Sequence, residues 1–189
     1  PSRGLGDVYK RQLYNKSMKL GPSEGLFSTH KFEGTPSVNN PHPQKGFLYN
    51  GAKNPDLDRF FLSPSHYALT LYAALIETKR LNDKSLNEFN KDGSVLDMIG
   101  SEHSPGHETN GGSFGQTISQ AAGVAWARRR KKEKGLVWLF LSDGEFQEGQ
   151  TWEALMSMAF HKISNLKIVV DVNGQQVDGK TCCLLYTSD

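Results

Sequence analysis

The chain has 189 residues, with 22 Lys and Arg against 20 Asp and Glu and a formal net charge of +2 at pH 7. A balance so close to neutrality does not support a nucleic-acid-binding or membrane-surface protein. No apolar run approaches the roughly 18 residues of a membrane span, and two cysteines make no disulfide framework. We therefore expect a cytoplasmic protein with one α/β core.

Both ends of the chain are unlike natural protein sequence. Residues 2–12, SRGLGDVYKRQ, are similar to the translation of a transposase adaptor used in sequencing libraries, and residues 183–189, CLLYTSD, resemble the other adaptor read outward. Segments of this kind are excluded from fold reasoning. We interpret residues 1–12 and 183–189 as adaptor-derived and residues 13–182 as a partial domain from a truncated reading frame.

The first native residues are expected to contain little regular structure. Residues 13–19, LYNKSMK, are typical of the end of an amphipathic helix. Residues 21–55 are rich in Gly, Pro, Asn and Ser without periodicity, which predicts a long irregular loop at the surface or at a binding site. His30 and His42 lie in this loop, at a spacing that matches no metal motif.

A strand and a helix are predicted over residues 58–75. Residues 60–62 are a short apolar run, and Ser63 or Ser65 can cap a helix that starts near His66. The apolar stripe of this helix is expected to comprise Tyr67, Leu71, Ala74 and Leu75. A histidine at a helix N-terminus is well placed to meet an anion, because the free amides and the helix dipole favour negative charge there. A capping or packing histidine is the alternative.

A glycine-rich loop and a long helix follow. A short helix is predicted over residues 82–89, and residues 100–116, GSEHSPGHETNGGSFGQ, then precede a long helix capped by Ser113 or Thr117. Glycines in such a loop let the backbone approach a phosphate group. The buried face of the long helix is expected to comprise Ile118, Ala121, Ala122, Ala125 and Trp126. The basic run at residues 128–134 is interpreted as the solvated end of this helix, where cations oppose the helix dipole.

The most informative stretch is a strand–helix–strand unit over residues 136–174. Apolar runs at residues 136–141 and 166–170 predict two buried parallel strands, each followed by turn residues. The helix between them is expected to bury Trp152, Leu155, Met156, Ala159 and Ile163. Ligands bind at the carboxyl ends of the strands in such units. Asp143 and Asn173 lie there, with the oxygen atoms that a hard divalent cation prefers.

At these residues the sequence resembles the thiamine diphosphate (ThDP) binding domain of the transketolase family. That family has Gly-Asp-Gly followed by an Asn after the next strand, matched here by SDGE at residues 142–145 and DVNG at residues 171–174. The resemblance implies a three-layer α/β sandwich with a mostly parallel sheet. It also implies that Asp143, Asn173 and the backbone carbonyl of Gln175 bind Mg²⁺ or Ca²⁺ on the cofactor's diphosphate. The cofactor-binding residues implied here are Asp143, Gly144, Glu145 and Asn173.

Two further motifs extend the resemblance. The family's DRFxLSxGHAxxxLYAxL is similar to residues 58–75, which implies His66 as a catalytic and cofactor-binding residue. The family's TGxLGQG is similar to residues 111–117, which implies that Gly112 and Phe114 line the cofactor.

Three positions depart from the family pattern. Ser142 replaces its first glycine, which the turn allows unless it needs a positive φ, and Pro-Ser replaces Lys-Gly at residues 64–65. The family's Gly-His-Pro-Glu motif has no counterpart at residues 95–100. We take His103 as the catalytic residue that stands in for the missing histidine, with His107 or a structural loop as alternatives.

The resemblance implies ThDP- and Mg²⁺-dependent transfer of a two-carbon ketol unit from a ketose to an aldose, with sugar phosphates as substrates. This chain would supply the diphosphate and metal half of the site. Its partner would be a pyrimidine-binding transketolase domain or subunit, in a homodimer or heterotetramer, so the chain alone should be inactive. Glu148 and Glu153 match acidic residues at the family's dimer interface. The alternatives are another ThDP enzyme, such as 1-deoxyxylulose-5-phosphate synthase, and a non-catalytic phosphate-binding α/β module.

Overall fold

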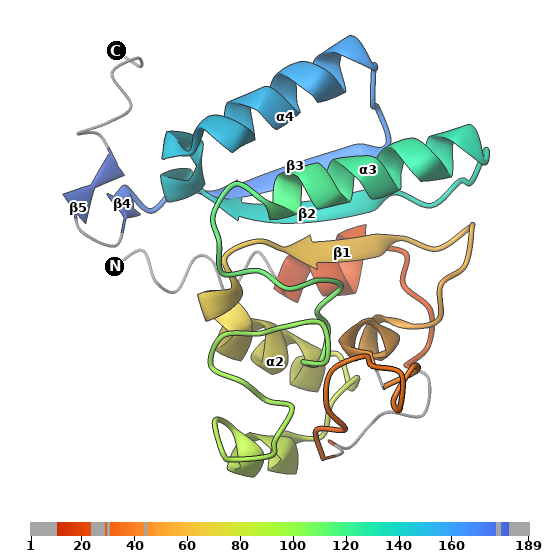
Figure 1. The fold of residues 1–189 in the computed structure, drawn as a ribbon, viewed down its shortest axis with the longest axis vertical. Coiled ribbons are helices and arrows are strands. Elements are labelled where there is room, and N and C mark those ends of the chain that lie inside the picture. The colour runs from red at the N-terminus through yellow and green to blue at the C-terminus, as the bar shows by residue number, and fades with distance from the viewer. Residues whose placement is uncertain (1–10, 24–28, 30, 44, 177–178, 182–189) are drawn as a thin grey trace.

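The centre of the molecule is a three-stranded sheet, seen in a computed structural model. Its strands lie in the order β1 (Arg59–Leu62), β2 (Val137–Ser142) and β3 (Leu166–Asp171). Both neighbouring pairs run parallel (Figure 1). The structure describes residues 11–23, 29, 31–43, 45–176 and 179–181. All three apolar runs identified in the sequence therefore form strands, as predicted. The predicted burial of the third strand was wrong, because β3 is half-buried with Lys167 exposed.

Helices cover both faces of this sheet and make three layers. α3 (Thr117–Arg130) and α4 (Gly149–Phe160) share one hydrophobic cluster with the sheet, and α2 (Ala68–Glu77) shares the other (Figure 1). Side chains alternate between the faces of a strand, so Phe61 packs in the α3–α4 cluster and Phe60 in the α2 cluster. This arrangement confirms the predicted three-layer α/β fold.

Shorter elements complete the chain. They are a π-helix at Leu13–Ser17, 3₁₀ helices at Gly46–Asn50, Ser65–Tyr67, Asp83–Glu88 and Asp143–Gln147, and the antiparallel pair β4 (Gln175–Gln176) and β5 (Gly179–Lys180). The short helix predicted near residues 82–89 is thus confirmed. The described part of residues 21–55 contains one of these 3₁₀ turns and is otherwise irregular. His30 and residues 1–10 and 183–189 lie outside the described residues.

The buried faces of α3 and α4 differ in part from the prediction. On α4 the buried residues are Thr151, Ala154 and Met158, whereas Trp152 and Met156 are 48% and 65% exposed. On α3 the predicted alanines and Ile118 are buried, but Trp126 is 43% exposed. Both helices carry more apolar residues than one buried face can hold. Periodicity therefore could not show which apolar stripe lies against the sheet.

The predicted serine and threonine caps were wrong. The Ser63 hydroxyl donates to the Glu145 carboxylate instead, and Ser65 Oγ is buried without a hydrogen-bond partner among the described residues. No side chain caps α3, whose N-cap residue is Gln116. Ser63 and Ser65 thus face the loops at the strand ends rather than the neighbouring helix.

The basic run also differs from its interpretation as a solvated helix end. Arg128 is only 4% exposed, and its guanidinium donates to the backbone carbonyls of Asn54, Pro55 and Leu57 at 2.7–3.1 Å. Arg128 also pairs with Glu133 at 2.9 Å. The first cation of the run therefore anchors the chain that leads into β1, because a guanidinium can satisfy several carbonyls at once.

At the amino ends of the strands, Asp58 is fully engaged by the protein. Its Oδ2 accepts hydrogen bonds from the Lys19 N–H (3.0 Å) and Trp138 Nε1 (2.9 Å), and its Oδ1 accepts one from the Leu136 N–H (2.8 Å). This edge of the sheet is consequently closed by hydrogen bonds within the protein.

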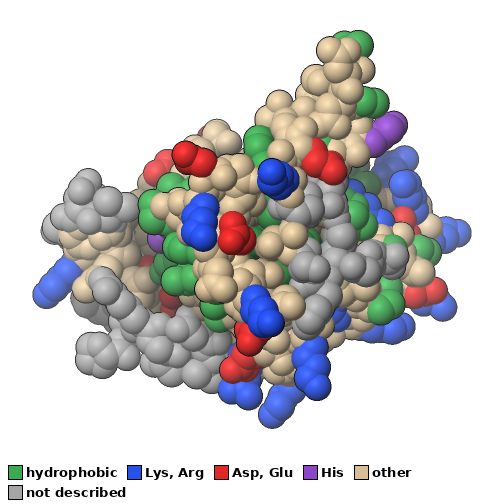
Figure 2. All heavy atoms as spheres, turned by 90° about the horizontal axis from the view of Figure 1, so that it is seen from below, with side chains coloured by type: hydrophobic (Ala, Val, Ile, Leu, Met, Phe, Trp, Pro, Cys, Tyr) green, Lys and Arg blue, Asp and Glu red, His purple; other side chains and the backbone are tan. Residues whose placement is uncertain are grey.

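The surface carries both signs of charge. On the face shown in Figure 2, basic and acidic side chains are intermingled, in keeping with the nearly neutral net charge. Within the part of the chain that the structure describes, no helix combines the length and apolar character needed to cross a membrane.

Candidate functional site

The turns that follow the three strands lie together at the carboxyl edge of the sheet. Ser142, the last residue of β2, pairs with Asp171, the last residue of β3, and the Ser63 N–H beyond β1 donates to the Phe140 carbonyl (3.0 Å). Ser142 has φ −104° and ψ 156°. This extended conformation is open to any L-residue, so a serine in place of the family's glycine introduces no strain.

Asp143 has one satisfied and one unsatisfied carboxylate oxygen. The side chain is buried, and its Oδ2 accepts hydrogen bonds from the Gly174 N–H (2.8 Å) and the Thr181 hydroxyl (3.1 Å). Its Oδ1 is buried with no hydrogen-bond partner among the described residues. A buried carboxylate oxygen without a partner is costly, so this atom is suited to bind a cation.

Asn173 lies in the turn after β3, and two hydrogen bonds fix its amide. Its Nδ2 donates to the Tyr67 hydroxyl (2.9 Å), and its Oδ1 accepts from the Gln175 N–H (2.8 Å). An amide oxygen has two lone pairs, so Oδ1 retains one for a further partner. The Gln175 carbonyl oxygen lies 3.8 Å from the position a Cβ would take on Gly144. The backbone oxygen predicted as a third ligand therefore lies beside the Asp143–Gly144 turn.

These donor atoms suit a hard cation. The described residues include no group of three or more His, Cys, Asp or Glu that could hold a metal. The set at this edge is instead one carboxylate, one amide and one backbone carbonyl, and Mg²⁺ usually completes such a shell with water and phosphate. The residues present therefore fit a divalent cation that also binds a diphosphate.

The glycine-rich loop packs closely on the other turns. Gly112 and Gly115 have φ +102° and +80°, a region that L side chains rarely adopt. A Cβ on Gly111 would lie 2.8 Å from the Ser63 carbonyl oxygen and 3.0 Å from Ser65 Oγ. The loop thus rests on the residues before α2 because it has no side chain at these positions.

The Glu145 carboxylate connects the turn after β1, the end of β2 and the glycine-rich loop. The side chain is fully buried, and its carboxylate accepts hydrogen bonds from the Ser63 hydroxyl, the Ser142 N–H (3.0 Å) and the Gly115 N–H (3.4 Å). Burial raises its pKa, whereas the hydrogen bonds from Ser63 and the neighbouring backbone lower it. Glu145 therefore holds the glycine-rich loop against the ends of β1 and β2.

His66 and Phe114, both predicted to line the cofactor, lie close together. His66 is exposed at the start of the helical segment that leads into α2, and its ring centroid lies 5.9 Å from that of Phe114 and 4.6 Å from that of Tyr67. Gly112 is exposed in the same loop as Phe114. The imidazole of His66 and the phenyl ring of Phe114 therefore lie next to exposed loop backbone that a ligand can approach.

His103 and His107, the two histidines of the following loop, occupy different environments. The His103 ring is partly exposed, lies 2.7 Å from Asp97 Oδ2 through its Nε2, and packs on Phe32 at 4.3 Å between centroids. His107 is buried, and burial lowers its pKa to about 4. The Gly100 N–H donates to the Ser65 carbonyl (3.1 Å), which ties this loop to the turn before His66.

Tyr67 is the site residue that sequence reasoning missed. The sequence pattern places it only in the apolar stripe of α2, yet its hydroxyl meets Asn173. Burial, followed by the charge of Asp171, raises its pKa to about 12. A tyrosine directly after a histidine at a helix start was the available signal, but nothing in the sequence showed that β3 ends beside it.

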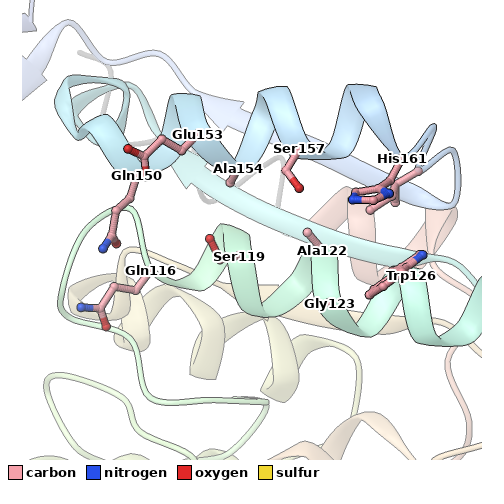
Figure 3. A pocket seen from close by; sticks show the side chains of 11 residues that line it. Gln116, Ser119, Ala122, Gly123, Trp126, Gln150, Glu153, Ala154, Ser157 and His161 are labelled. Atoms are coloured by element: carbon pink, nitrogen blue, oxygen red, sulfur yellow. The ribbon is translucent and has the colours of Figure 1, made fainter.

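A separate groove lies between α3 and α4, with a volume of about 510 Å³. Small residues such as Ala122, Gly123 and Ala154 form part of its lining. Glu153 lies near one end, and Trp126 lies near the other (Figure 3).

Comparison with known proteins agrees with this fold. Residues 45–188 match the family profile described as transketolase, thiamine diphosphate binding domain. A transketolase family protein of Sinorhizobium fredii is 45% identical over 129 residues, which are 68% of this chain and 46% of that protein. An apulose-4-phosphate transketolase subunit of Actinobacillus succinogenes is 33% identical over 135 residues, 71% of this chain and 49% of that protein.

The fold is also found in a solved transketolase. The enzyme from Leishmania mexicana superposes with a TM-score of 0.67 at 23% identity, over 91% of this chain and 23% of that chain. The molecule is thus a parallel α/β domain of the ThDP-binding class. The chain belongs to the transketolase family, which confirms the resemblance found in the sequence. It spans about half the length of the two curated relatives described above.

Proposed function

We propose that this chain supplies the diphosphate and metal half of a transketolase active site, which transfers a two-carbon ketol unit from a ketose to an aldose. The observation that carries this proposal is the buried Oδ1 of Asp143, which has no hydrogen-bond partner among the described residues and lies beside Asn173 and the Gln175 carbonyl. An anionic cofactor with Mg²⁺ or Ca²⁺ would satisfy that atom and use the free lone pair of the Asn173 amide.

The residues around this edge have distinct tasks in the proposal. Asp143, Asn173 and the Gln175 carbonyl bind the cation, and the loop with Gly112 and Phe114 brings backbone and a ring against the cofactor. Gly144 leaves room at the turn, and Glu145 holds the loop from below. ThDP, when bound, supplies the nucleophilic carbon and the electron sink for breaking and forming a carbon–carbon bond.

Two histidines are assigned to the substrate side. His66 is exposed beside Phe114, where a ring N–H can donate to the diphosphate or to a sugar phosphate. His103 is held by Asp97, which favours a ring orientation suited to moving a proton to or from a substrate hydroxyl. In this proposal the Asp97–His103 pair replaces the missing histidine of the family's Gly-His-Pro-Glu motif.

A partner completes the site in this proposal. The relative from Actinobacillus succinogenes is named as one subunit of its enzyme, which supports a second subunit that carries the pyrimidine-binding domain. Glu148 and Glu153 are exposed, and Glu153 lies at the groove between α3 and α4, as expected for residues that meet another subunit. The assembled enzyme would be a homodimer or a heterotetramer, and this chain alone would be inactive.

Calorimetric titration of ThDP with and without Mg²⁺ tests the proposal. The full chain would be co-expressed with a candidate pyrimidine-binding subunit, and the wild type compared with Asp143→Ala. We expect metal-dependent binding in the wild type. In the variant the affinity should fall by at least the roughly ten- to hundred-fold loss that follows removal of an outer-shell partner.

The matched control is Asp92→Ala, which removes an exposed carboxylate from a turn outside this edge. It should bind ThDP like the wild type. Equal ThDP affinity in the wild type and Asp143→Ala would refute the assignment of Asp143 as a metal ligand. If neither the wild type nor the variants bind ThDP with the partner subunit present, the remaining interpretation of the chain is a non-catalytic phosphate-binding α/β module.

A further inference from the structure

The Tyr67 hydroxyl connects the start of α2 to the turn after β3. It accepts a hydrogen bond from Asn173 Nδ2 (2.9 Å). The ring lies edge-on to those of His66 (4.6 Å) and Phe140 (6.4 Å). Its position is therefore fixed by packing as well as by this hydrogen bond.

The partners of the Asn173 amide set the direction of each hydrogen bond. The Gln175 N–H can only donate, so the amide atom that it meets is the oxygen. The NH₂ group therefore faces Tyr67, whose hydroxyl oxygen accepts from it. Together the two hydrogen bonds determine which way the Asn173 amide points.

The amide orientation decides whether Asn173 can bind a cation. With Nδ2 toward Tyr67, Oδ1 accepts from the Gln175 N–H and keeps one lone pair for a cation. The next residue, Gly174, donates its N–H to Asp143 Oδ2, so the two turns are in contact. A flipped amide would present NH₂ to the cation, and an NH₂ group has no lone pair to give.

We propose that Tyr67 is a positioning residue, whose hydroxyl accepts from the NH₂ group of Asn173 and so holds the amide with its oxygen toward the metal. This inference rests on the proposed function, because it assumes that Asn173 binds the cation. Partners behind a metal ligand commonly change metal affinity by about ten- to hundred-fold.

The test measures metal binding directly, with Mn²⁺ as the probe. Mn²⁺ accepts the same oxygen ligands as Mg²⁺, and its free concentration can be followed by electron paramagnetic resonance in the presence of ThDP. The full chain with its pyrimidine-binding subunit would be compared with Tyr67→Phe, which keeps the ring and removes the hydroxyl. We expect Mn²⁺ affinity to fall about ten-fold. Tyr72→Phe is the matched control, because its hydroxyl donates to the Asp97 carbonyl instead, and it should bind like the wild type.

A double-mutant cycle with Asn173→Asp separates orientation from general stability. A carboxylate presents an oxygen in either orientation, so Tyr67→Phe should change Mn²⁺ affinity less than two-fold in the Asn173→Asp background. An equal loss in both backgrounds would overturn the positioning role, as would an unchanged affinity in Tyr67→Phe alone. A wild type that binds no Mn²⁺ would instead refute the proposed function, and the inference with it.

Discussion

Two aspartates at opposite ends of the sheet differ in how far the protein satisfies them. Both oxygens of Asp58 accept hydrogen bonds from protein donors at the amino edge. At the carboxyl edge Asp143 has an oxygen with no partner among the described residues. Buried polar groups are normally paired, so an exception of this kind indicates either a ligand site or local instability. The same residue type is thus fully paired at one edge of the sheet and only partly paired, among the described residues, at the other.

His107 should make stability depend on pH. Burial lowers its pKa from 6.5 to about 4 in the folded chain. Between pH 6.5 and 4 the unfolded chain therefore binds a proton that the folded chain does not, so the free energy of unfolding should fall as the pH falls through this window. The contribution of this group is about 3 kcal/mol. Urea denaturation at pH 7 and pH 4.5 would measure it.

The variant His107→Leu should show a smaller drop than the wild type, because a neutral side chain cannot take up a proton. His42→Asn, a change at an exposed loop position, should keep the wild-type drop. Identical pH dependence in the wild type and His107→Leu would refute this assignment.

The glycine-rich loop shows how elements rather than single residues build the site. Its glycines allow it to lie on the turn after β1, and the buried Glu145 carboxylate holds it to β2. A glycine-rich loop has few side chains of its own to pack, so its position depends largely on the residues that it lies against. Changes at Glu145 should therefore affect folding and cofactor binding together.

The variant Glu145→Gln tests this coupling. It keeps the size of the side chain but replaces one acceptor oxygen with an NH₂ group that faces backbone N–H donors. We expect the free energy of unfolding to fall by about 2 kcal/mol and ThDP binding to weaken. Glu88→Gln, at an exposed position, should change neither quantity. A Glu145→Gln protein with wild-type stability and affinity would contradict the role of Glu145.

The sequence was informative where local pattern and spacing determine structure. Apolar runs located the three strands, and the positions of Asp143 and Asn173 after two of them predicted the edge where they now lie. The caps failed because Ser63 and Ser65 face segments remote in sequence. Tyr67 was missed for the same reason, since its partner Asn173 approaches only once β3 has joined the sheet.

At the scale of the whole molecule, α4 leaves a row of apolar side chains uncovered. Trp152, Met156 and Phe160 are 48%, 65% and 81% exposed at four-residue steps. Apolar residues grouped in this way commonly mark a surface that another protein covers. The groove between α3 and α4 lies beside this helix (Figure 3), and both belong to the face where the proposal places another subunit.

Replacing the most exposed of these residues should weaken assembly. We expect Phe160→Asp to lower the mass measured by light scattering for the chain purified with its pyrimidine-binding subunit, because a charge would be buried at the interface. Val38→Asp, at a loop residue that is 98% exposed, is the control and should leave the mass unchanged. If both variants assemble like the wild type, α4 is not part of the interface.

The strand order has a consequence for how the site forms during folding. β2 and β3 are joined by a single helix, and Val137 and its partner Leu166 are 29 residues apart, whereas Val137 and its partner Arg59 in β1 are 78 residues apart. Closing a long loop costs more entropy and slows pairing, so β2, α4 and β3 should associate before β1 joins them. Asp143 and Asn173 would then come together early, and His66 and Tyr67 would arrive only with the last strand.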